Sequence, residues 1–160
     1  MNFLQFVFGS FELKIVLVMT KVLFSDECPG KISYVVIGAR YNGKWAFIRH
    51  RERGGYEIPA GHPEEGESDN EAAARELTEE TGAGSFTMRP VCYYTVVTGN
   101  DAANGRLYLS EVKSFGEIRD TDEIERLVFS DDIPGEMSLP VVMKALFDRL
   151  RKELLKDNTL

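Results

Sequence analysis

An apolar run near the middle of the chain is followed by a turn and a second apolar run. The first, Ile32 to Ala39 (ISYVVIGA), is rich in β-branched residues, as strands are. Asn42-Gly43 then precedes Lys44 to His50 (KWAFIRH), and Asn-Gly between two such runs is a strong hairpin signal. The pattern therefore predicts two strands joined by a tight turn.

Two helices are predicted from their ends and their apolar spacing. Ser68 and Glu71 have the spacing of a capping box, and the helix they begin continues to Gly82, a residue suited to a left-handed C-cap. A second helix begins near Ser138 with Pro140 in its first turn. Its apolar residues recur at helical spacing and predict a face packed on a sheet: Leu139, Val142, Met143, Leu146, Phe147, Leu150 and Leu154.

Further strands are expected between the two helices, near Thr87 to Val97, Arg106 to Val112 and Arg126 to Phe129, separated by glycine-containing loops. Strands and helices do not alternate strictly along the chain. The order therefore indicates an α+β sandwich with a mixed sheet.

The first 30 residues are predicted to form one or two strands or an extension of the fold. Their apolar run is interrupted by Glu12 and Lys14 and lacks a basic start, so neither a signal peptide nor a membrane span is expected. Met19 is an alternative start, which leaves open whether residues 1–18 are an extension. A chain of 160 residues is long enough to bury one core, so residues 1–160 are expected to form a single domain.

Composition indicates an ordinary soluble protein, with 43% hydrophobic and 28% charged residues. Cys28 and Cys92 have neither metal-ligand nor redox spacing, and two free thiols favour a cytoplasmic location. No basic stripe argues for a nucleic-acid partner, and no phosphate-binding P-loop sequence is present.

The net charge of −7 is concentrated in one segment. Eight carboxylates lie between Glu64 and Glu80, where Arg75 is the only basic residue, and the rest of the chain is balanced. Such a run is either a solvated helix face or a divalent-cation site. Glu76, Glu79 and Glu80 have the i, i+3, i+4 spacing that brings side chains together on one helix face, where they repel unless a cation lies among them.

The same segment resembles the Nudix box of MutT-like hydrolases. From Gly61 there are five residues, then Glu67, then seven residues, then Arg75-Glu76-Leu77-Thr78-Glu79-Glu80-Thr81-Gly82-Ala83. All seven fixed positions match, whereas the small Ala83 takes the place of a larger aliphatic residue. The similarity of layout extends from Ser33 to Leu150 and implies a Nudix-type α/β/α sandwich with a mixed β-sheet.

The resemblance implies an Mg²⁺- or Mn²⁺-dependent enzyme that cleaves a diphosphate linkage in a small-molecule nucleotide. Composition and charge argue against a membrane or nucleic-acid partner, and a homodimer stays open. The implied metal-shell residues are Ala60 (through its carbonyl), Glu67, Glu76, Glu79 and Glu80, with Arg75 orienting the carboxylates. The general base is Glu76, Glu123 or Glu125, and Glu123 is taken as the catalytic residue of the later loop.

Substrate recognition is expected from the basic cluster before the box. This cluster contains Arg49, His50, Arg51 and Arg53, and one or more of them could bind the outer phosphates. Arg49, at the end of a strand, and Arg51 are the predicted substrate-binding residues. Four aromatic residues could stack on a base, although core packing is the simpler interpretation for each: Tyr34, Trp45, Phe47 and Tyr56.

Several substrate classes stay open at this point. The short chain with its Gly-Lys-Trp strand is weakly similar to nucleotide-sanitising hydrolases of the 8-oxo-dGTP type. The alternatives are an ADP-ribose or nucleotide-sugar hydrolase, an RNA 5′ pyrophosphohydrolase, and a non-catalytic nucleotide-sensing domain. The intact set of box carboxylates favours an enzyme over a sensor.

Overall fold

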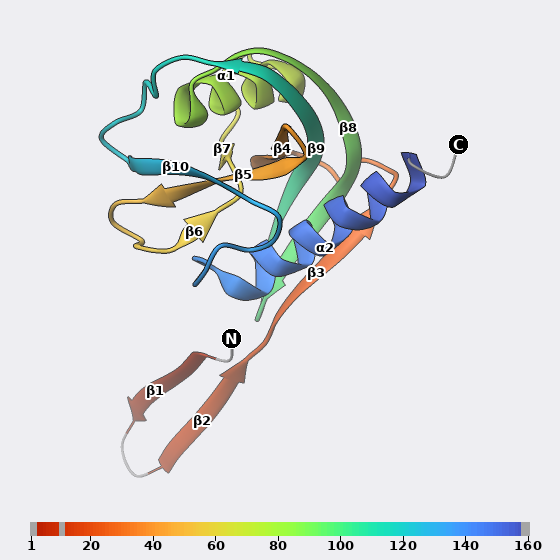
Figure 1. Cartoon of the computed structure of the whole chain (residues 1–160). Coiled ribbons are helices and arrows are strands. Elements are labelled where there is room, and N and C mark those ends of the chain that lie inside the picture. The colour runs from red at the N-terminus through yellow and green to blue at the C-terminus, as the bar shows by residue number, and fades with distance from the viewer. Residues whose placement is uncertain (1–2, 10–11, 158–160) are drawn as a thin grey trace.

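The computed structural model describes residues 3–9 and 12–157, with side chains from Met19 to Lys156. Its elements follow the chain as β1 (Phe3–Gly9), β2 (Glu12–Val18), β3 (Thr20–Ser25), β4 (Tyr34–Tyr41), β5 (Lys44–His50), β6 (Tyr56–Glu57), β7 (Ala60–Gly61), α1 (Asp69–Thr81), β8 (Ala83–Thr98), β9 (Asp101–Phe115), β10 (Ile124–Ser130) and α2 (Pro140–Asp157). An eight-stranded sheet has the order β10-β5-β4-β9-β8-β3, with β6 beside β5 and β7 beside β4 (Figure 1). The β4–β9 pair is parallel and the other pairs are antiparallel, so the predicted mixed sheet is confirmed.

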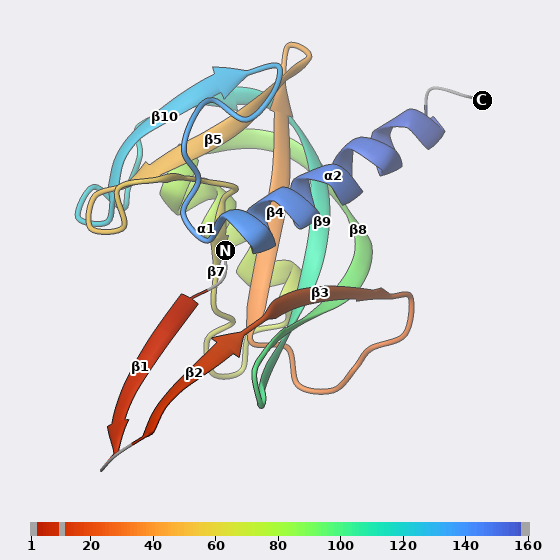
Figure 2. The ribbon, with the colours of Figure 1, turned by 90° about the horizontal axis from the view of Figure 1, so that it is seen from below.

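The central strand β4 is buried on both faces, which explains its unbroken apolar sequence. Val35 and Ile37 pack with Ala72, Ala73 and Leu77 of α1. The residues between them face the other side, where a second core includes Val36 together with Met143, Leu146 and Phe147 of α2. Figure 2 shows α2 across one face of the sheet with α1 behind it, so the α/β/α sandwich is also confirmed.

Both predicted helices are present, with the expected ends. Ser68 accepts a hydrogen bond from the Glu71 backbone N–H, and the Glu71 carboxylate accepts one from the Ser68 N–H, which completes the capping box. Gly82 ends α1 in the left-handed conformation at φ 75°. Neither α1 nor α2, the two helices in the described part of the chain, combines the length and apolar character needed to cross a membrane.

The hairpin at Asn42-Gly43 opens after two residue pairs, and this opening positions the site. β4 and β5 pair only through Arg40 with Trp45 and Tyr41 with Lys44. Beyond them the chain between residues 51 and 61 enters the gap, so that Ala60 pairs with Val36 on β4. A hydrogen bond from the Ile37 N–H to the Pro59 carbonyl fixes this insertion.

The N-terminal residues and the long strands differ from the sequence-based expectation. Three strands, not one or two, lie in the first 25 residues: β1 and β2 form a separate two-stranded sheet, whereas β3 is an edge strand of the main sheet. β8 and β9 are longer than predicted at both ends because they continue as one paired hairpin around Gly99-Asn100. Local sequence does not reveal this continuation, since it depends on pairing across the hairpin.

Candidate active site

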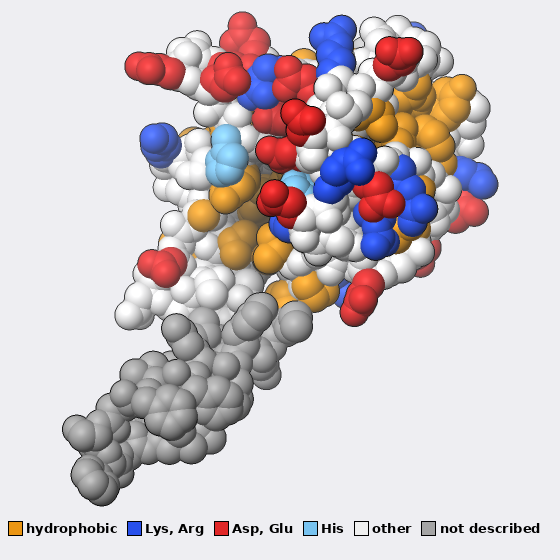
Figure 3. All heavy atoms as spheres, turned by 90° about the vertical axis from the view of Figure 1, so that its left-hand side faces the viewer, with side chains coloured by type: hydrophobic (Ala, Val, Ile, Leu, Met, Phe, Trp, Pro, Cys, Tyr) orange, Lys and Arg blue, Asp and Glu red, His pale blue; other side chains and the backbone are white. Residues whose placement is uncertain are grey.

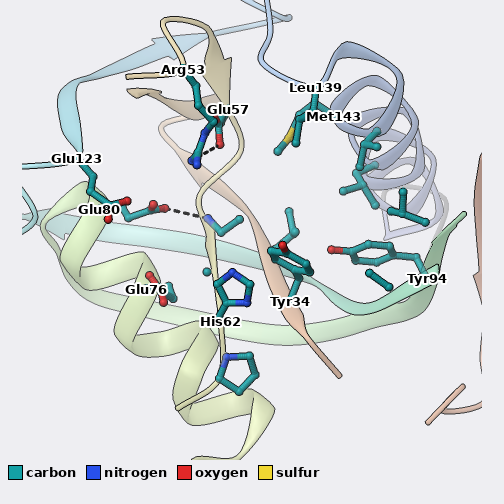
Figure 4. Close-up of a pocket in the computed structure, with 18 of the residues that line it drawn as sticks. Tyr34, Arg53, Glu57, His62, Glu76, Glu80, Tyr94, Glu123, Leu139 and Met143 are labelled. Atoms are coloured by element: carbon teal, nitrogen blue, oxygen red, sulfur yellow. Dashed lines mark hydrogen bonds and ion pairs between the residues drawn. The ribbon is translucent and has the colours of Figure 1, made fainter. Parts of the chain in front are cut away.

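A cavity of 910 Å³ lies between the acidic face of α1, the inserted β7 and the first turns of α2. Figure 3 shows acidic side chains gathered beside a hollow whose visible lining is hydrophobic. Figure 4 shows Glu76, Glu80 and Glu123 at one end of the cavity, and Tyr34, Tyr94 and Met143 at the other. The cavity is therefore charged at one end and apolar at the other.

Glu80 is almost fully buried at this site, at 4% exposure, as is Glu57. Its Oε2 accepts a hydrogen bond from the Ala60 backbone N–H, with 2.8 Å between the two atoms. Among the described residues it forms no ion pair with a basic side chain. Burial raises the pKa of Glu80 well above the usual carboxyl range, and the bond from Ala60 only partly opposes this.

Glu76 lies against the backbone of Gly61. A Cβ built at Gly61 would collide with the Glu76 carboxylate, so only glycine leaves room for the two to approach so closely. Burial raises the pKa of Glu76, and the neighbouring Arg75 opposes the rise without cancelling it. Glu79, one turn further along α1, also lines the cavity.

Arg75 gathers the carboxylates of this segment. Its Nε and Nη2 donate to the two oxygens of Glu67, each at 2.9 Å, in a bidentate pair. Its Nη1 donates to Glu76 at 2.9 Å and to Glu79 at 3.2 Å, and Nη2 also donates to the His62 carbonyl. Hydrogen bonds to Glu67, above all, raise the pKa of Arg75, and Arg75 in turn lowers the pKa of Glu67.

Not all of the residues that were predicted to surround a metal line the cavity. Ala60, Glu76, Glu79 and Glu80 line the cavity, whereas Glu67 is turned to Arg75 and is absent from the lining. Within the described residues, no three His, Cys, Asp or Glu side chains are disposed so that they could hold a metal ion as they stand. Glu76 and Glu79 instead share one nitrogen of Arg75.

The donor set nevertheless fits a hard divalent cation. All the candidate ligands are oxygens, which Mg²⁺ and Mn²⁺ prefer. Glu80 is a buried carboxylate without a basic partner among the described residues, and such a group is stable in its charged form only beside a cation. Glu76, Glu79, Glu80 and the Ala60 carbonyl are the groups that could hold one.

The loop before β10 brings a second acidic pair to the cavity. The carbonyl of Glu79 accepts hydrogen bonds from the N–H groups of Arg119 and Asp120, so the loop is attached to α1. The Asp120 side chain then accepts from the Glu123 N–H at 3.1 Å. Both Asp120 and Glu123 line the cavity, whereas Glu125 pairs with Arg49 and does not.

His50 forms a hydrogen bond with the carboxylate of Glu123. Its Nδ1 accepts hydrogen bonds from the N–H groups of Glu52 and Arg53, so neutral His50 carries its proton on Nε2. Nε2 therefore donates to Glu123 Oε2, at 3.2 Å. The sequence did not indicate this role, because His50 and Glu123 are far apart in the chain.

The basic cluster before the box has a different geometry from the one expected. Arg49 and Arg51 are not part of the cavity lining: Arg49 Nε donates to Glu125, and Arg51 Nε donates to the Thr121 carbonyl. Arg53 lines the cavity instead, where it forms a bidentate pair with the buried Glu57 at 2.6 and 3.0 Å. The expected phosphate contact from Arg49 or Arg51 is therefore not supported, because the loop turns these side chains toward β10.

Of the aromatic residues considered for stacking on a base, some lie in the core and one lines the cavity. Trp45 and Phe47 are buried in the core against Phe147 of α2, and Tyr56 packs under Arg49. Tyr34 lines the apolar end of the cavity and is 41% exposed. The neighbouring cavity residues Tyr94 and Val96 were not predicted as site residues, although their alternation on β8 was visible in the sequence.

Comparison with known proteins identifies the family of the chain. The family model of the NUDIX domain matches residues 31–140. The chain is 31% identical over 121 residues to YtkD of Bacillus subtilis (strain 168), a protein provisionally named an 8-oxo-dGTP diphosphatase, and the match covers 74% of this chain and 76% of YtkD.

Solved structures show the same fold. The Bacillus subtilis pyrophosphohydrolase BsRppH superposes with a TM-score of 0.71 at 24% identity, over 84% of this chain and 92% of BsRppH. A NUDIX hydrolase from Nitrosomonas europaea superposes with a TM-score of 0.64 at 26% identity, over 77% of this chain and 90% of that protein. With the family model, the relative and the fold in agreement, the chain belongs to the Nudix family and is a hydrolase of phosphorus-containing anhydrides.

Proposed function

We propose that this Nudix hydrolase cleaves a diphosphate linkage of a nucleoside triphosphate with the help of Mg²⁺ or Mn²⁺, and that 8-oxo-dGTP-type nucleotides are its first candidate substrates. The observation that carries the proposal is the buried carboxylate of Glu80, which lacks a basic partner among the described residues and lies in a cavity beside Glu76 and Glu79. A cation would balance this charge.

Glu76, Glu79, Glu80 and the Ala60 carbonyl are the proposed metal-holding groups. With a divalent cation bound, these groups would place it where it would neutralise charge on the phosphoryl oxygens and lower the pKa of an attacking water. Arg75 keeps Glu76 and Glu79 adjacent before the cation binds. Glu67 is assigned to orient Arg75 rather than to contact the metal directly, since both of its oxygens accept from that guanidinium.

Glu123 is the proposed general base. It faces the cavity from the loop that Asp120 and the C-terminal turn of α1 hold in place. The hydrogen bond from His50 Nε2 fixes the direction of its carboxylate. The carboxylate would accept a proton from water as that water attacks phosphorus and a phosphate-bearing group leaves.

Arg53 is the proposed ligand of an outer phosphate. It lines the cavity and is held beside Glu57 by two charge-assisted hydrogen bonds. Half of its side chain remains exposed, which leaves guanidinium donors free to turn toward an incoming anion. This assignment replaces Arg49 and Arg51 as the substrate-binding arginines.

The substrate class is supported by the sequence relationship to YtkD and by the apolar end of the cavity, which suits an uncharged base. A nucleotide-sanitising enzyme acts on free nucleotides, so no nucleic-acid surface is needed. The net charge of −7 is consistent with a small substrate neutralised by a cation rather than with a polyanionic partner.

A turnover assay tests the proposal. Purified protein is incubated with 8-oxo-dGTP, dGTP, dATP, ADP-ribose, a UDP-sugar and 5′-triphosphorylated RNA, in Mg²⁺, in Mn²⁺ and in EDTA. We expect metal-dependent hydrolysis, fastest with the 8-oxo nucleotide. Glu80→Gln is expected to reduce kcat by more than about 100-fold, because even outer partners of metal ligands account for about 10- to 100-fold.

Glu65→Gln is the matched control, because Glu65 belongs to the same acidic segment but is exposed and outside the cavity lining. It is expected to retain full activity. Equal rates for Glu80→Gln and the native protein, or full activity in EDTA, would overturn the metal assignment. Tight nucleotide binding without any turnover would identify a sensor instead of an enzyme.

A further inference from the structure

The apolar end of the cavity has a floor made by two paired strands. Tyr94 and Val96 both line the cavity from the same face of β8, two residues apart. Their partners on β9 are the small residues Gly105 and Ala103. Ala103 lines the cavity with Tyr94 and Val96, and Leu139, Val142, Met143 and Leu146 line it from the α2 segment.

Tyr94 lies across this floor in a way that only glycine permits. A Cβ at position 105 would collide with the Tyr94 ring and its hydroxyl, so the ring crosses directly over the Gly105 backbone. The residue is 3% exposed, and Figure 4 shows its hydroxyl directed toward Tyr34 inside the cavity. Gly105 therefore determines where this hydroxyl points.

The Tyr94 hydroxyl lacks a partner. It forms no hydrogen bond with any residue that the structure describes. Burial raises the pKa of the group, so it stays protonated and can both donate and accept. Among the described residues, the fully buried polar side-chain atoms without a partner are Arg40 Nε and Ser138 Oγ, so the Tyr94 hydroxyl is instead open to the cavity and available to whatever occupies it. A bound ligand with a polar edge would supply a partner.

The walls around this hydroxyl suit a flat, uncharged ring. Tyr34 is 41% exposed and offers a ring face, held at 4.2 Å from the His62 ring. Met143 and Val96 add apolar contacts. In Figure 4 the carboxylates of Glu76, Glu80 and Glu123 lie away from Tyr34 and Tyr94, and the Arg53–Glu57 pair lies between them and Met143.

The distance between the two ends is consistent with one molecule occupying both. Ala60 on β7 and Tyr94 on β8 are separated by β4 and β9. At about 4.8 Å for each strand spacing, their backbones are about 14 Å apart. A nucleotide has this polarity, with charged phosphates at one end and an aromatic base at the other.

We propose that Tyr94 determines base specificity: its hydroxyl hydrogen-bonds a polar edge of a purine base that stacks against Tyr34 at the apolar end of the cavity. The inference rests on the proposed nucleotide hydrolysis and adds the residue that recognises the base. The tyrosine hydroxyl can meet either a carbonyl or a ring N–H, so it accommodates a guanine-type or 8-oxo-guanine-type edge.

The test removes the hydroxyl and the exocyclic polar groups of the base separately. Native protein and Tyr94→Phe are compared on 8-oxo-dGTP, dGTP and purine deoxyriboside 5′-triphosphate, whose base lacks exocyclic polar groups. We expect Tyr94→Phe to lower kcat/KM about 3- to 10-fold for the best guanine-type substrate, mainly through KM. The purine deoxyriboside nucleotide should be hydrolysed equally by the two proteins.

Tyr93→Phe is the matched control, because Tyr93 is the next residue on β8 but points to the opposite face, where it packs under Arg106. It should change none of the three rates. A uniform effect of Tyr94→Phe on all three nucleotides, with a lowered Tm, would mean that the hydroxyl has a structural role and would overturn the proposal. An absence of any effect would overturn it as well.

A binding measurement separates this inference from the proposed chemistry. Calorimetric titration of the three nucleotides in EDTA reports on the base site without turnover. If no nucleotide is hydrolysed but Tyr94→Phe still weakens binding of the guanine-type nucleotide alone, the hydrolytic function fails and the base site stands. If hydrolysis is normal and binding is identical in the two proteins, the base site fails alone.

Discussion

The carboxylate of Glu80 on α1 accepts a hydrogen bond from the backbone N–H of Ala60 on β7, with 2.8 Å between Oε2 and N. This contact joins the acidic helix to the segment that enters the gap between β4 and β5. It satisfies one oxygen lone pair of a carboxylate that is almost fully buried. It does not neutralise the charge, and that imbalance has consequences for stability.

The metal-free protein is expected to lose stability as pH rises. The folded-state pKa values of Glu80 and Glu76 lie above their usual carboxyl values, so the folded protein holds these protons more tightly than the unfolded chain. Their contribution is fully present below the unfolded-state pKa and is lost as pH rises through the folded-state pKa. Urea unfolding in EDTA between pH 4 and pH 9 measures the effect.

The variant Glu80→Gln separates this contribution from other titrations. Glutamine keeps the acceptor for Ala60 but cannot ionise, so the variant should be more stable than the native protein in EDTA at pH 8, with the gap closing toward pH 4. Millimolar Mg²⁺ should stabilise only the native protein. A native protein whose stability is unaffected by Mg²⁺ at pH 8 would contradict the metal site.

Arg75→Lys is expected to lower kcat by about 10- to 100-fold. Lysine keeps the positive charge but cannot form the bidentate pair with Glu67 while also donating to Glu76 and Glu79. The Mg²⁺ concentration for half-maximal rate should rise, because the carboxylates are no longer held together. Arg119→Lys, on an exposed position nearby, is the control and should leave both quantities unchanged.

Gly61→Ala tests the close approach of Glu76 to the backbone. The added Cβ collides with the Glu76 carboxylate and must turn it away, so activity should fall by about 10-fold or more while the fold survives. Gly116→Ala is the matched control, because a Cβ there meets no atom closer than the Gly82 carbonyl at 3.8 Å. Crystal structures of the two variants would show whether Glu76 has moved.

The box helix could be predicted in detail because its signals are local. The capping box of Ser68 and Glu71, the Gly82 end and the i, i+3, i+4 spacing of the glutamates all lie within one helix. The resemblance to the Nudix box then gave the fold, since the spacing from Gly61 to Gly82 carries both chemistry and topology.

The rest of the site depends on contacts between distant parts of the chain. Arg53 lines the cavity and Arg49 does not, because the loop of residues 51–55 turns them in different directions. Strand alternation alone could not reveal this difference. His50 meets Glu123 only because β5 pairs with β10. The Tyr94 hydroxyl can occupy its position because the facing residue, Gly105, has no side chain.

Glu123→Gln and Glu125→Gln should differ strongly. Glu123 lines the cavity with His50 behind it, whereas Glu125 faces Arg49 outside the lining. We expect Glu123→Gln to reduce kcat by about 100-fold or more, because glutamine cannot accept the proton of the attacking water. Glu125→Gln should stay within about twofold of the native rate. Equal effects of the two variants would remove Glu123 as the base.

Charged residues cluster around Glu153 at the outer end of α2, away from the proposed active site. Burial of Glu153 opposes its ionisation, but hydrogen bonds from Arg149, Lys156 and Arg89 outweigh this and lower its pKa to about 2. Because the folded-state pKa is depressed, the contribution to stability is present above the ordinary carboxyl pKa and is lost as pH falls toward 2. Glu153→Gln should therefore cost roughly 2 kcal/mol at pH 7 and progressively less below pH 4.5.

Asp148→Asn on the same helix is the control for that measurement. Within the part of the chain whose side chains are described, Asp148 pairs only with the exposed Lys144 at 3.4 Å, and half of its side chain is exposed. Exposed ion pairs of this kind contribute little, so its loss should cost less than about 0.5 kcal/mol at any pH. If Glu153→Gln and Asp148→Asn gave the same small change at pH 7, the Glu153 cluster would hold α2 against β8 no more firmly than an ordinary surface pair.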